Sequence, residues 1–130
     1  MIKYISTLQG LKPNDFNGFF VDWKKPLSVL QQINILKNST YFILAYDTEK
    51  SRVVGFINAL SDKVNFAFIP LLEVLPEYQN QGIGSNLLKK MLEKLKNYQC
   101  IDLTCDIEMQ GFYEQFNMIK SHGMVIRKYL

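Results

Sequence analysis

The stretch that decides the fold is residues 72–85, LEVLPEYQNQGIGS. It passes from a short apolar segment, through a polar turn, into an amphipathic helix. Two glycines, Gly82 and Gly84, enclose a single residue, which lets the backbone come close to a ligand. The first amides of the following helix have no intrahelical acceptor and can therefore bind an anion. The pattern predicts an anion-binding turn.

Two common phosphate-binding motifs do not fit this turn. The dinucleotide fingerprint requires a third glycine where the chain has Leu87. The P-loop ends in lysine followed by serine or threonine, whereas Gly84 is followed by Ser85 and Asn86. The alternative to an anion-binding turn is an ordinary tight turn that binds no ligand.

The turn resembles the acetyl-CoA signature of the GNAT acetyltransferases, Gln/Arg-x-x-Gly-x-Gly/Ala, with Gln79, Gly82 and Gly84 at its fixed positions. Residues 112–118, FYEQFNM, are similar to a second signature of that family, close to Phe-Tyr-Glu-Lys-x-Gly-Phe. Residues 72–78 resemble the family's fourth strand and its exit. Two signatures in this order, with a helix and a strand between them, are strong evidence of a relationship.

Hydrophobic periodicity gives the order of the elements. Strands are expected at residues 2–6, 41–46, 52–60, 64–74 and 101–106, with two final strands within 118–129. Helices are expected from residues 12–15 through Phe20 to a break at 24–26, from Pro26 to about Ser39, and over residues 84–96 and 108–116. Pro70 has no N–H for a ladder, so the strand that contains it should be bulged.

This order is the GNAT order from end to end. The resemblance therefore implies one α/β domain of mixed α+β type over residues 1–130. Its expected architecture is a single mixed, mostly antiparallel sheet flanked by helices, with splayed fourth and fifth strands.

Composition narrows the function classes. No apolar run approaches the roughly twenty residues of a membrane span, and the amino terminus has no signal-peptide core, so a cytoplasmic location is expected. The net charge of +3 is too mild and dispersed for nucleic-acid binding as a primary function, although it helps to attract a polyanion such as CoA. Cys100 and Cys105 lack metal-site spacing and are expected to be buried, unpaired thiols.

The resemblance implies that acetyl-CoA is the cosubstrate, with no metal. Its pyrophosphate is expected on the amides of residues 81–85, with Gln79 adding a side-chain donor and the helix dipole adding favourable charge. Around Val74 an unpaired strand edge should offer backbone groups to the pantetheine arm, and the resemblance implies that the Val74 amide also polarises the acetyl carbonyl. The expected cosubstrate-binding residues are Val74, Leu75, Gln79, Asn80, Gln81, Gly82, Ile83, Gly84, Ser85 and Phe112.

Tyr113 aligns with the tyrosine that protonates the departing CoA thiolate in many members of that family. A phenol, with a reference pKa near 10, is protonated at neutral pH and can donate to a thiolate as it forms. The alternative is a packing role, as for an aromatic pair with Phe112. Asn117 replaces the usual glycine of the signature, which is tolerable because asparagine also adopts left-handed backbone conformations.

Glu73 is the first choice for a catalytic group that binds or deprotonates the amine. It should point away from the face of its apolar neighbours, and a carboxylate within an apolar stretch needs a reason. A structural ion pair with a lysine or arginine explains it equally well. Asp22 and Trp23 could bind a cation, Asp22 through its charge and Trp23 through the face of its ring. The alternative is that Asp22 ends a helix and Trp23 covers the core. Asp106 stands where the second signature often has asparagine and could contact an amine acceptor.

These residues predict an N-acetyltransferase that moves acetyl from acetyl-CoA to a primary amine, most simply on a small molecule. Direct attack in a ternary complex is expected, since no nucleophile candidate stands out. A protein amino terminus or lysine is the second acceptor class. An acyl-CoA-binding sensor or assembly module without turnover is the alternative of another class. The expected partners are acetyl-CoA and an amine acceptor, with no nucleic acid and no membrane, and a homodimer is compatible because many relatives are dimers.

Overall fold

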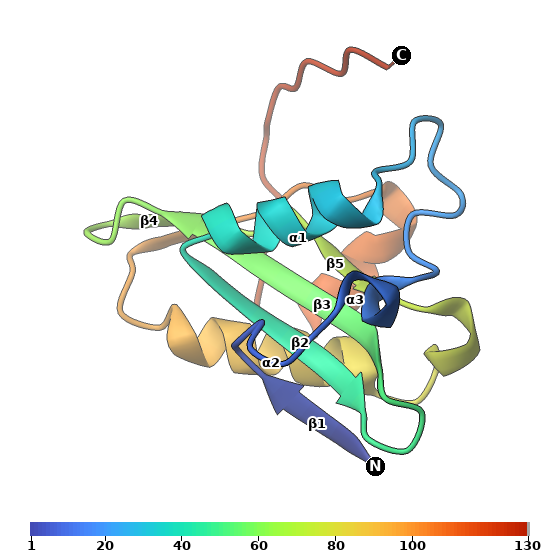
Figure 1. Ribbon diagram of the computed structural model, residues 1–130. Coiled ribbons are helices and arrows are strands. Elements are labelled where there is room, and N and C mark those ends of the chain that lie inside the picture. The colour runs from blue at the N-terminus through green and yellow to red at the C-terminus, as the bar shows by residue number, and fades with distance from the viewer. Residues whose placement is uncertain (130) are drawn as a thin grey trace.

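A computed structural model describes residues 1–129. It contains a six-stranded sheet in the order β1, β2, β3, β4, β6, in which β5 also pairs with β3 (Figure 1). β4 and β6 run parallel, and the other pairs are antiparallel. The strands are β1 (Ile2–Ile5), β2 (Tyr41–Asp47), β3 (Arg52–Ser61), β4 (Phe66–Phe68), β5 (Leu72–Val74) and β6 (Cys100–Asp102). The helices are α1 (Val29–Asn38), α2 (Ile83–Lys94) and α3 (Gln110–Glu114), with 3₁₀ turns η1 (Pro13–Phe16), η2 (Pro76–Tyr78) and η3 (Ile107–Met109).

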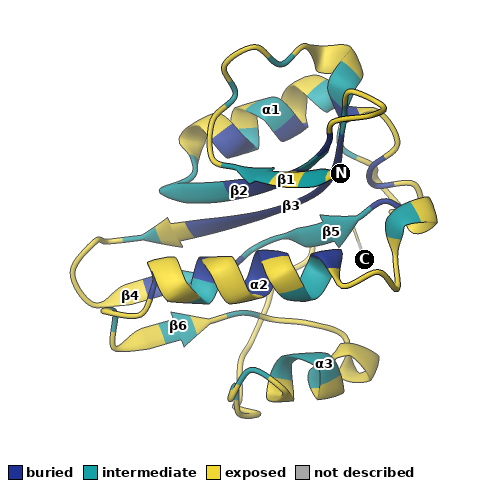
Figure 2. Ribbon diagram, turned by 90° about the horizontal axis from the view of Figure 1, so that it is seen from below, coloured by how far each residue is buried: buried dark blue, intermediate teal, exposed yellow. Residues whose placement is uncertain are grey.

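The two longer helices cover opposite faces of the sheet, with α1 on one side and α2 on the other (Figure 2). On the α1 side, Phe19 and Phe20 pack against Phe56 of β3, with ring centroids 5.3 and 6.0 Å from it. On the other side, α2 buries Ile83, Leu87, Leu88 and Met91. The expected mixed sheet flanked by helices is confirmed.

The first expected helix is wrong in its extent. Only η1 forms, and the chain turns extended at Asn17. Gly18 and Phe20 then have φ angles of 103° and 65°, a left-handed backbone that cannot continue a right-handed helix. The phenylalanines of this segment still reach the core, but they do so from a turn and a loop.

The next helix also starts later than the expected Pro26. Ser28 is the N-cap of α1, and its Oγ accepts a hydrogen bond from the Gln31 N–H at 3.1 Å. The Gln31 side chain in turn accepts from the Ser28 N–H at 2.9 Å. This reciprocal capping box fixes the helix start, because it satisfies two amides that otherwise lack partners.

The two final strands expected within residues 118–129 are wrong. The structure has no strand there, and the segment leaves the sheet towards the carboxy terminus (Figure 1). The side chains of Ile119, Met124 and Ile126 are 88%, 100% and 85% exposed. The apolar content is that of a strand, but this stretch finds no strand of its own chain to pair with.

The strand expected over residues 64–74 is interrupted at Pro70, as its missing N–H predicts. Ile69 and Pro70 together lie opposite the single residue Ala59 of β3, which makes a β-bulge. Before the bulge β4 pairs with β6, whereas after it β5 pairs with β3 alone. A gap therefore separates β5 from β6, and this is the predicted splay.

Asn58 of β3 holds the bulge in place. Its side chain is 1% exposed, and its Oδ1 accepts from the Leu71 N–H at 3.0 Å. The Asn58 backbone N–H donates to the Leu71 carbonyl at 3.2 Å. Its Nδ2 donates to the Ser39 Oγ at 3.0 Å, just beyond the end of α1. Asn58 thus replaces a ladder bond at the break and ties the break to α1.

We expect Asn58→Ala to lower the free energy of unfolding by about 1 to 3 kcal/mol, because the part-buried Leu71 N–H loses its acceptor. Chemical denaturation measures this change. The control is Asn97→Ala, since Asn97 is exposed and its change should stay within about 0.5 kcal/mol. Equal stability of the two variants would show that Asn58 does not hold the bulge.

Candidate functional site

The turn between η2 and α2 gathers free backbone amides. Gly82 is the N-cap of α2 with a φ of 83°, and Asn80 has a φ of 63°. The first helical bond runs from the Asn86 N–H to the Gly82 carbonyl at 3.0 Å. The amides of Ile83, Gly84 and Ser85 therefore have no acceptor within the helix. They stand at the positive end of the helix dipole, where an anion is stabilised.

Both glycines of the turn border open space. A Cβ placed on Gly82 would meet no other atom within 4 Å, and one on Gly84 would meet only the Val74 Cγ2, at 3.7 Å. Packing within the chain therefore does not require a glycine at position 84. An anionic group that approaches the helix start fits this open space, whereas a side chain would fill it.

Gln79 does not reach over the helix start in this structure. Its Nε2 donates to the Val74 carbonyl at 3.0 Å, which ties the turn to the end of β5. The Leu75 N–H donates to the Val54 carbonyl of β3 at 2.9 Å. Because backbone groups alternate between the two edges of a strand, the Val74 N–H faces away from β3 and into the gap. The Val74 N–H is thus a free donor on the strand edge that was expected to contact the pantetheine arm.

The base of the turn is anchored by contacts that the sequence patterns did not indicate. Leu75 is 1% exposed, and its carbonyl accepts from the Tyr78 N–H at 2.9 Å. The Tyr78 hydroxyl donates to Asp47 Oδ2 at 2.6 Å. This bond lowers the pKa of Asp47, aided by backbone N–H groups of Glu49 and Lys50. The turn is therefore fixed to the end of β2. No local sequence motif predicts that residues 47 and 78 are in contact.

Glu73 faces the α1 side of the sheet, opposite Phe56 and away from the Val74 side chain, as alternation predicts. Its Oε1 accepts from the Phe20 N–H at 2.9 Å. Its Oε2 is buried and has no hydrogen-bond partner among residues 1–129. No lysine or arginine of that part of the chain forms an ion pair with it.

Burial raises the pKa of Glu73, the Phe20 N–H opposes this effect, and the negative charge of Asp22 adds to the rise. A carboxylate with a raised pKa and one unused oxygen is suited to bind an ammonium or accept its proton. The structure therefore brings Glu73 and Asp22 together, and the Phe20 backbone is the contact that sequence reasoning missed.

Trp23 completes this cluster. Its ring lies edge-on to Phe20 with 4.8 Å between centroids, and the side chain is 42% exposed. Trp23, Pro70 and Thr104 line a cavity of about 500 Å³ beside the gap. The cavity therefore joins the loop before α1 to the bulge and to the chain that follows β6. Thr104 was not expected, and no sequence signal distinguishes it.

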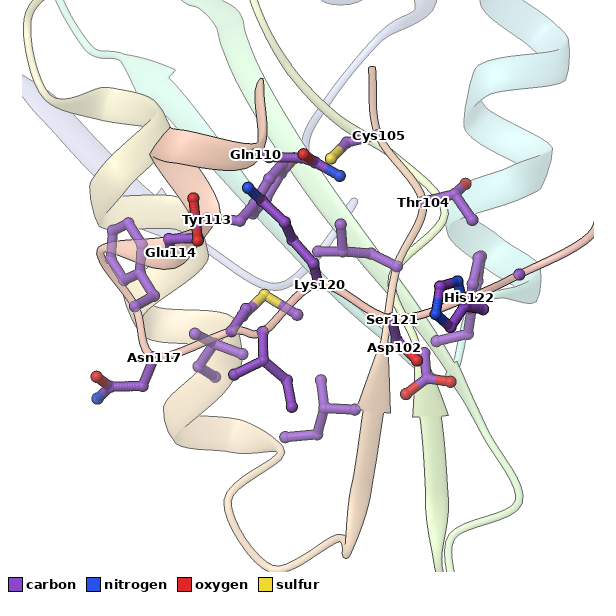
Figure 3. A pocket seen from close by; sticks show the side chains of 18 of the residues that line it. Asp102, Thr104, Cys105, Gln110, Tyr113, Glu114, Asn117, Lys120, Ser121 and His122 are labelled. Carbon is purple, nitrogen blue, oxygen red and sulfur yellow. The ribbon is translucent and has the colours of Figure 1, made fainter. Parts of the chain in front are cut away.

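Tyr113 lies on α3, close to Cys105 in the chain that follows β6. Burial raises its pKa, and the nearby Cys105 adds to the rise, so the phenol holds its proton at neutral pH. Its ring packs at 5.0 Å from Phe112. Tyr113, Cys105 and Gln110 line a larger cavity of about 760 Å³ (Figure 3). The Tyr113 hydroxyl is therefore suited to act as a proton donor to a ligand in this cavity.

Asp106 belongs to the Tyr113 side rather than to the Glu73 cluster. It is exposed and immediately follows Cys105, at the start of η3. Cys100 and Cys105 are free and exposed, so the expectation of buried thiols was wrong. In residues 1–129 no three His, Cys, Asp or Glu side chains gather to hold a metal ion, and no helix there is long and apolar enough to cross a membrane.

Comparison with known proteins identifies relatives along most of the chain. The profile of the acetyltransferase (GNAT) family matches residues 9–118. A protein of Pyropia yezoensis described as an uncharacterized N-acetyltransferase is 29% identical over 105 residues, which are 77% of this chain and 59% of that protein. This chain thus spans less than two thirds of that relative.

Solved structures agree in fold. A candidate acetyltransferase from Deinococcus radiodurans R1 superposes with a TM-score of 0.94 and 36% identity, over 98% of this chain and 89% of that one. A GNAT-family acetyltransferase from Streptococcus pneumoniae TIGR4 gives a TM-score of 0.77 and 28% identity, over 98% and 99% of the two chains. The match extends over the bulge, the turn and both walls of the gap.

Proposed function

Because the chain belongs to the acetyltransferase (GNAT) family, we propose that it transfers acetyl from acetyl-CoA to a primary amine on a small molecule. The observation that carries the proposal is the buried Oε2 of Glu73, which has no hydrogen-bond partner among residues 1–129 and lies one residue before the Val74 N–H that faces the gap. An ammonium group is the natural partner of that oxygen. The acetyl donor would then occupy the gap between β5 and β6.

The free amides of Ile83, Gly84 and Ser85 would hold the pyrophosphate of acetyl-CoA, and the Val74 N–H would bind an acyl or pantetheine oxygen. The bound cosubstrate supplies an acetyl group activated as a thioester. Gln79 positions the turn by its bond to the Val74 carbonyl. Fixed donors of this kind need no rearrangement when charge develops, which is the main source of their catalytic value.

Glu73 and Tyr113 would move protons on opposite walls of the gap. Glu73 would bind the ammonium form of the acceptor and take its proton through Oε2, directly or through water, while the Phe20 N–H holds Oε1 in place. Tyr113 would donate its hydroxyl proton to the departing thiolate. Asp22 and Trp23 would favour a cationic acceptor by charge and by the ring face.

A thiol-release assay with acetyl-CoA and a panel of amines tests this function. The panel contains polyamines, aminoglycosides, arylalkylamines, amino acids and short peptides. We expect release with small amines that exceeds hydrolysis without amine. Release with peptides alone would reassign the acceptor to protein. If acetyl-CoA raises the Tm but no amine causes release of the CoA thiol, the domain is assigned to acyl-CoA sensing.

We expect Glu73→Gln to lower kcat by roughly a hundredfold, because the amide cannot take the proton of the acceptor. The remaining rate should rise with the fraction of free amine at high pH. Glu49→Gln is the matched control on the exposed surface and should leave both kinetic parameters unchanged. A raised KM with unchanged kcat would limit Glu73 to binding, and unchanged kinetics would make it structural.

The same variant should not lose stability at neutral pH. Burial raises the folded-state pKa of Glu73, so its charged form opposes folding above the unfolded-state pKa of about 4.3. Glutamine removes that charge and still accepts from the Phe20 N–H. The gain in Tm over wild type should therefore fade as pH drops towards 4. A Tm loss that grows with pH would contradict this assignment.

A further inference from the structure

The cavity of about 500 Å³ beside the gap has walls from two parts of the chain that differ in chemistry. One wall is apolar and includes Trp23, Phe68 and Pro70. The other wall is the carboxy-terminal segment, and every residue from 124 to 129 contributes to it. A cavity of this size accommodates a small organic molecule. The carboxy-terminal segment is therefore in a position to select what binds there.

Both charged residues that line this cavity are cationic. They are Arg127 and Lys128, and no aspartate or glutamate of residues 1–129 lines it. Both are exposed, and neither forms an ion pair within that part of the chain. An anionic group in the cavity would accept charge-assisted hydrogen bonds from them. Arg127 suits this task best, because a guanidinium binds a carboxylate or phosphate through two parallel N–H bonds.

Negative charge lies next to Trp23, on the apolar wall. Asp22 precedes Trp23 in the chain, and its charge acts on Glu73. The Glu73 Oε2 is buried and has no hydrogen-bond partner among residues 1–129. The Trp23 ring packs on Phe20, whose N–H donates to the Glu73 Oε1. The cavity thus has an acidic pair next to one wall and a basic pair in the other.

The smaller cavity adjoins the larger one that Tyr113 lines. The two share Phe68 and Thr104, together with Met124 and Val125 of the carboxy-terminal segment. A molecule in the smaller cavity would therefore lie beside the cavity in which Tyr113 is proposed to protonate the thiolate. This is the place where an acceptor has to be held.

We propose that the acceptor is an amine that also carries an anionic group, either a carboxylate or a phosphate. Its ammonium would bind Glu73 and Asp22, and its anion would bind Arg127 and Lys128. The inference rests on the proposed function and names the acceptor class. In the transfer the amine nitrogen forms the amide bond as the thioester C–S bond breaks. Glu73 takes the proton of the ammonium, the thiolate takes that of Tyr113, and the anionic group serves only in binding.

Matched acceptor pairs test the class on the wild-type protein. One arm compares ω-amino acids of increasing chain length, from β-alanine upward, with their primary amides, which have the same size and lack the negative charge. The other arm compares phosphoethanolamine with ethanolamine. The distant carboxylate of an ω-amino acid leaves the basicity of the amine nearly unchanged, so the comparison reports binding. Thiol release gives kcat/KM for each acceptor.

We expect kcat/KM to be roughly fivefold higher, or more, for the anionic member of the best pair, because two exposed cations each contribute modestly. This preference should shrink as salt is added. The better arm distinguishes a carboxylate from a phosphate. If the uncharged members react equally well, the inference is overturned while acetyl transfer stands. If no amine of any kind releases thiol, the proposed function fails and this inference fails with it.

Variants of the carboxy-terminal wall test the residues. Arg127→Gln and Lys128→Gln should each raise KM roughly threefold for the anionic acceptor and leave that of its uncharged partner unchanged. Arg127→Glu should reverse the preference, in favour of diamines. Lys37→Gln, on the exposed surface of α1, is the matched control and should preserve the wild-type preference. A merely structural role would change both members of a pair alike. A preference that survives removal of both cations would overturn the proposal.

Discussion

Gly84→Leu is expected to weaken acetyl-CoA binding by about a hundredfold or more, a loss of at least about 2.7 kcal/mol, while the domain stays folded. The leucine side chain would occupy the open space over the free amides of α2, where the pyrophosphate is proposed to lie. Gly84 is a better test than Gly82, because Gly82 needs its left-handed φ of 83° and would be strained by any side chain. Isothermal titration calorimetry measures the loss.

The protein itself should tolerate the Gly84 change. A Cβ there comes no closer than 3.7 Å to another residue, and leucine is a better helix former than glycine, so Tm should hold or rise. Gly84→Ala should have a smaller effect on affinity, and Lys89→Leu, on the exposed face of α2, should have none. If a folded Gly84→Leu protein bound acetyl-CoA with wild-type affinity, the pyrophosphate would not bind at this turn.

Tyr113→Phe is expected to lower kcat by roughly tenfold to a thousandfold, because it deletes the hydroxyl that would protonate the departing thiolate. Acetyl-CoA affinity should barely change, since the ring and its packing on Phe112 remain. Steady-state kinetics with the best acceptor of the amine panel, together with calorimetry, separate the two effects. An acceptor-independent fall in kcat is the signature of the general acid.

Tyr46→Phe is the matched control for this change. Tyr46 is a partly buried tyrosine of β2, and its hydroxyl makes no side-chain hydrogen bond within residues 1–129. It should keep wild-type turnover. If Tyr113→Phe also turns over at the wild-type rate, Tyr113 is a packing residue, and the proton donor has to be sought elsewhere in the cavity.

The features that the sequence predicted correctly are local. The missing N–H of Pro70 is a property of one residue, and it breaks its strand wherever that strand lies in the sheet. The alternation that turns Glu73 away from Val74 is set within three residues. Asn117 adopts the expected left-handed backbone, with a φ of 67°. Such features survive because no distant contact is needed to produce them.

The features that the sequence missed depend on residues far apart in the chain. Phe20 leaves the expected helix because its N–H binds the Glu73 carboxylate on a strand more than fifty residues later. Asn58 meets Leu71 only because β3 and β5 share a particular register. The bond from Tyr78 of η2 to Asp47 at the end of β2 likewise joins residues far apart in the chain. Periodicity holds no information about these pairings.

The final segment illustrates a different limit. Residues 118–129 have the apolar content of strands and partly line the same cavity as Ile101 and Asp102 of β6, yet they make no backbone hydrogen bond to that strand. Strand propensity describes a local preference, and it does not show whether a pairing neighbour is available.

Transfer of label from [¹³C]acetyl-CoA to an amine, read by mass spectrometry of the acceptor, tests the proposed chemistry most directly. With the wild-type protein and a small primary amine, the predicted result is one labelled acetyl group per acceptor, in an amount equal to the thiol released. Glu73→Gln and Gly84→Leu should each reduce both signals together. Thiol release with the label only in free acetate, and none in any amine, would contradict acetyl transfer to an amine.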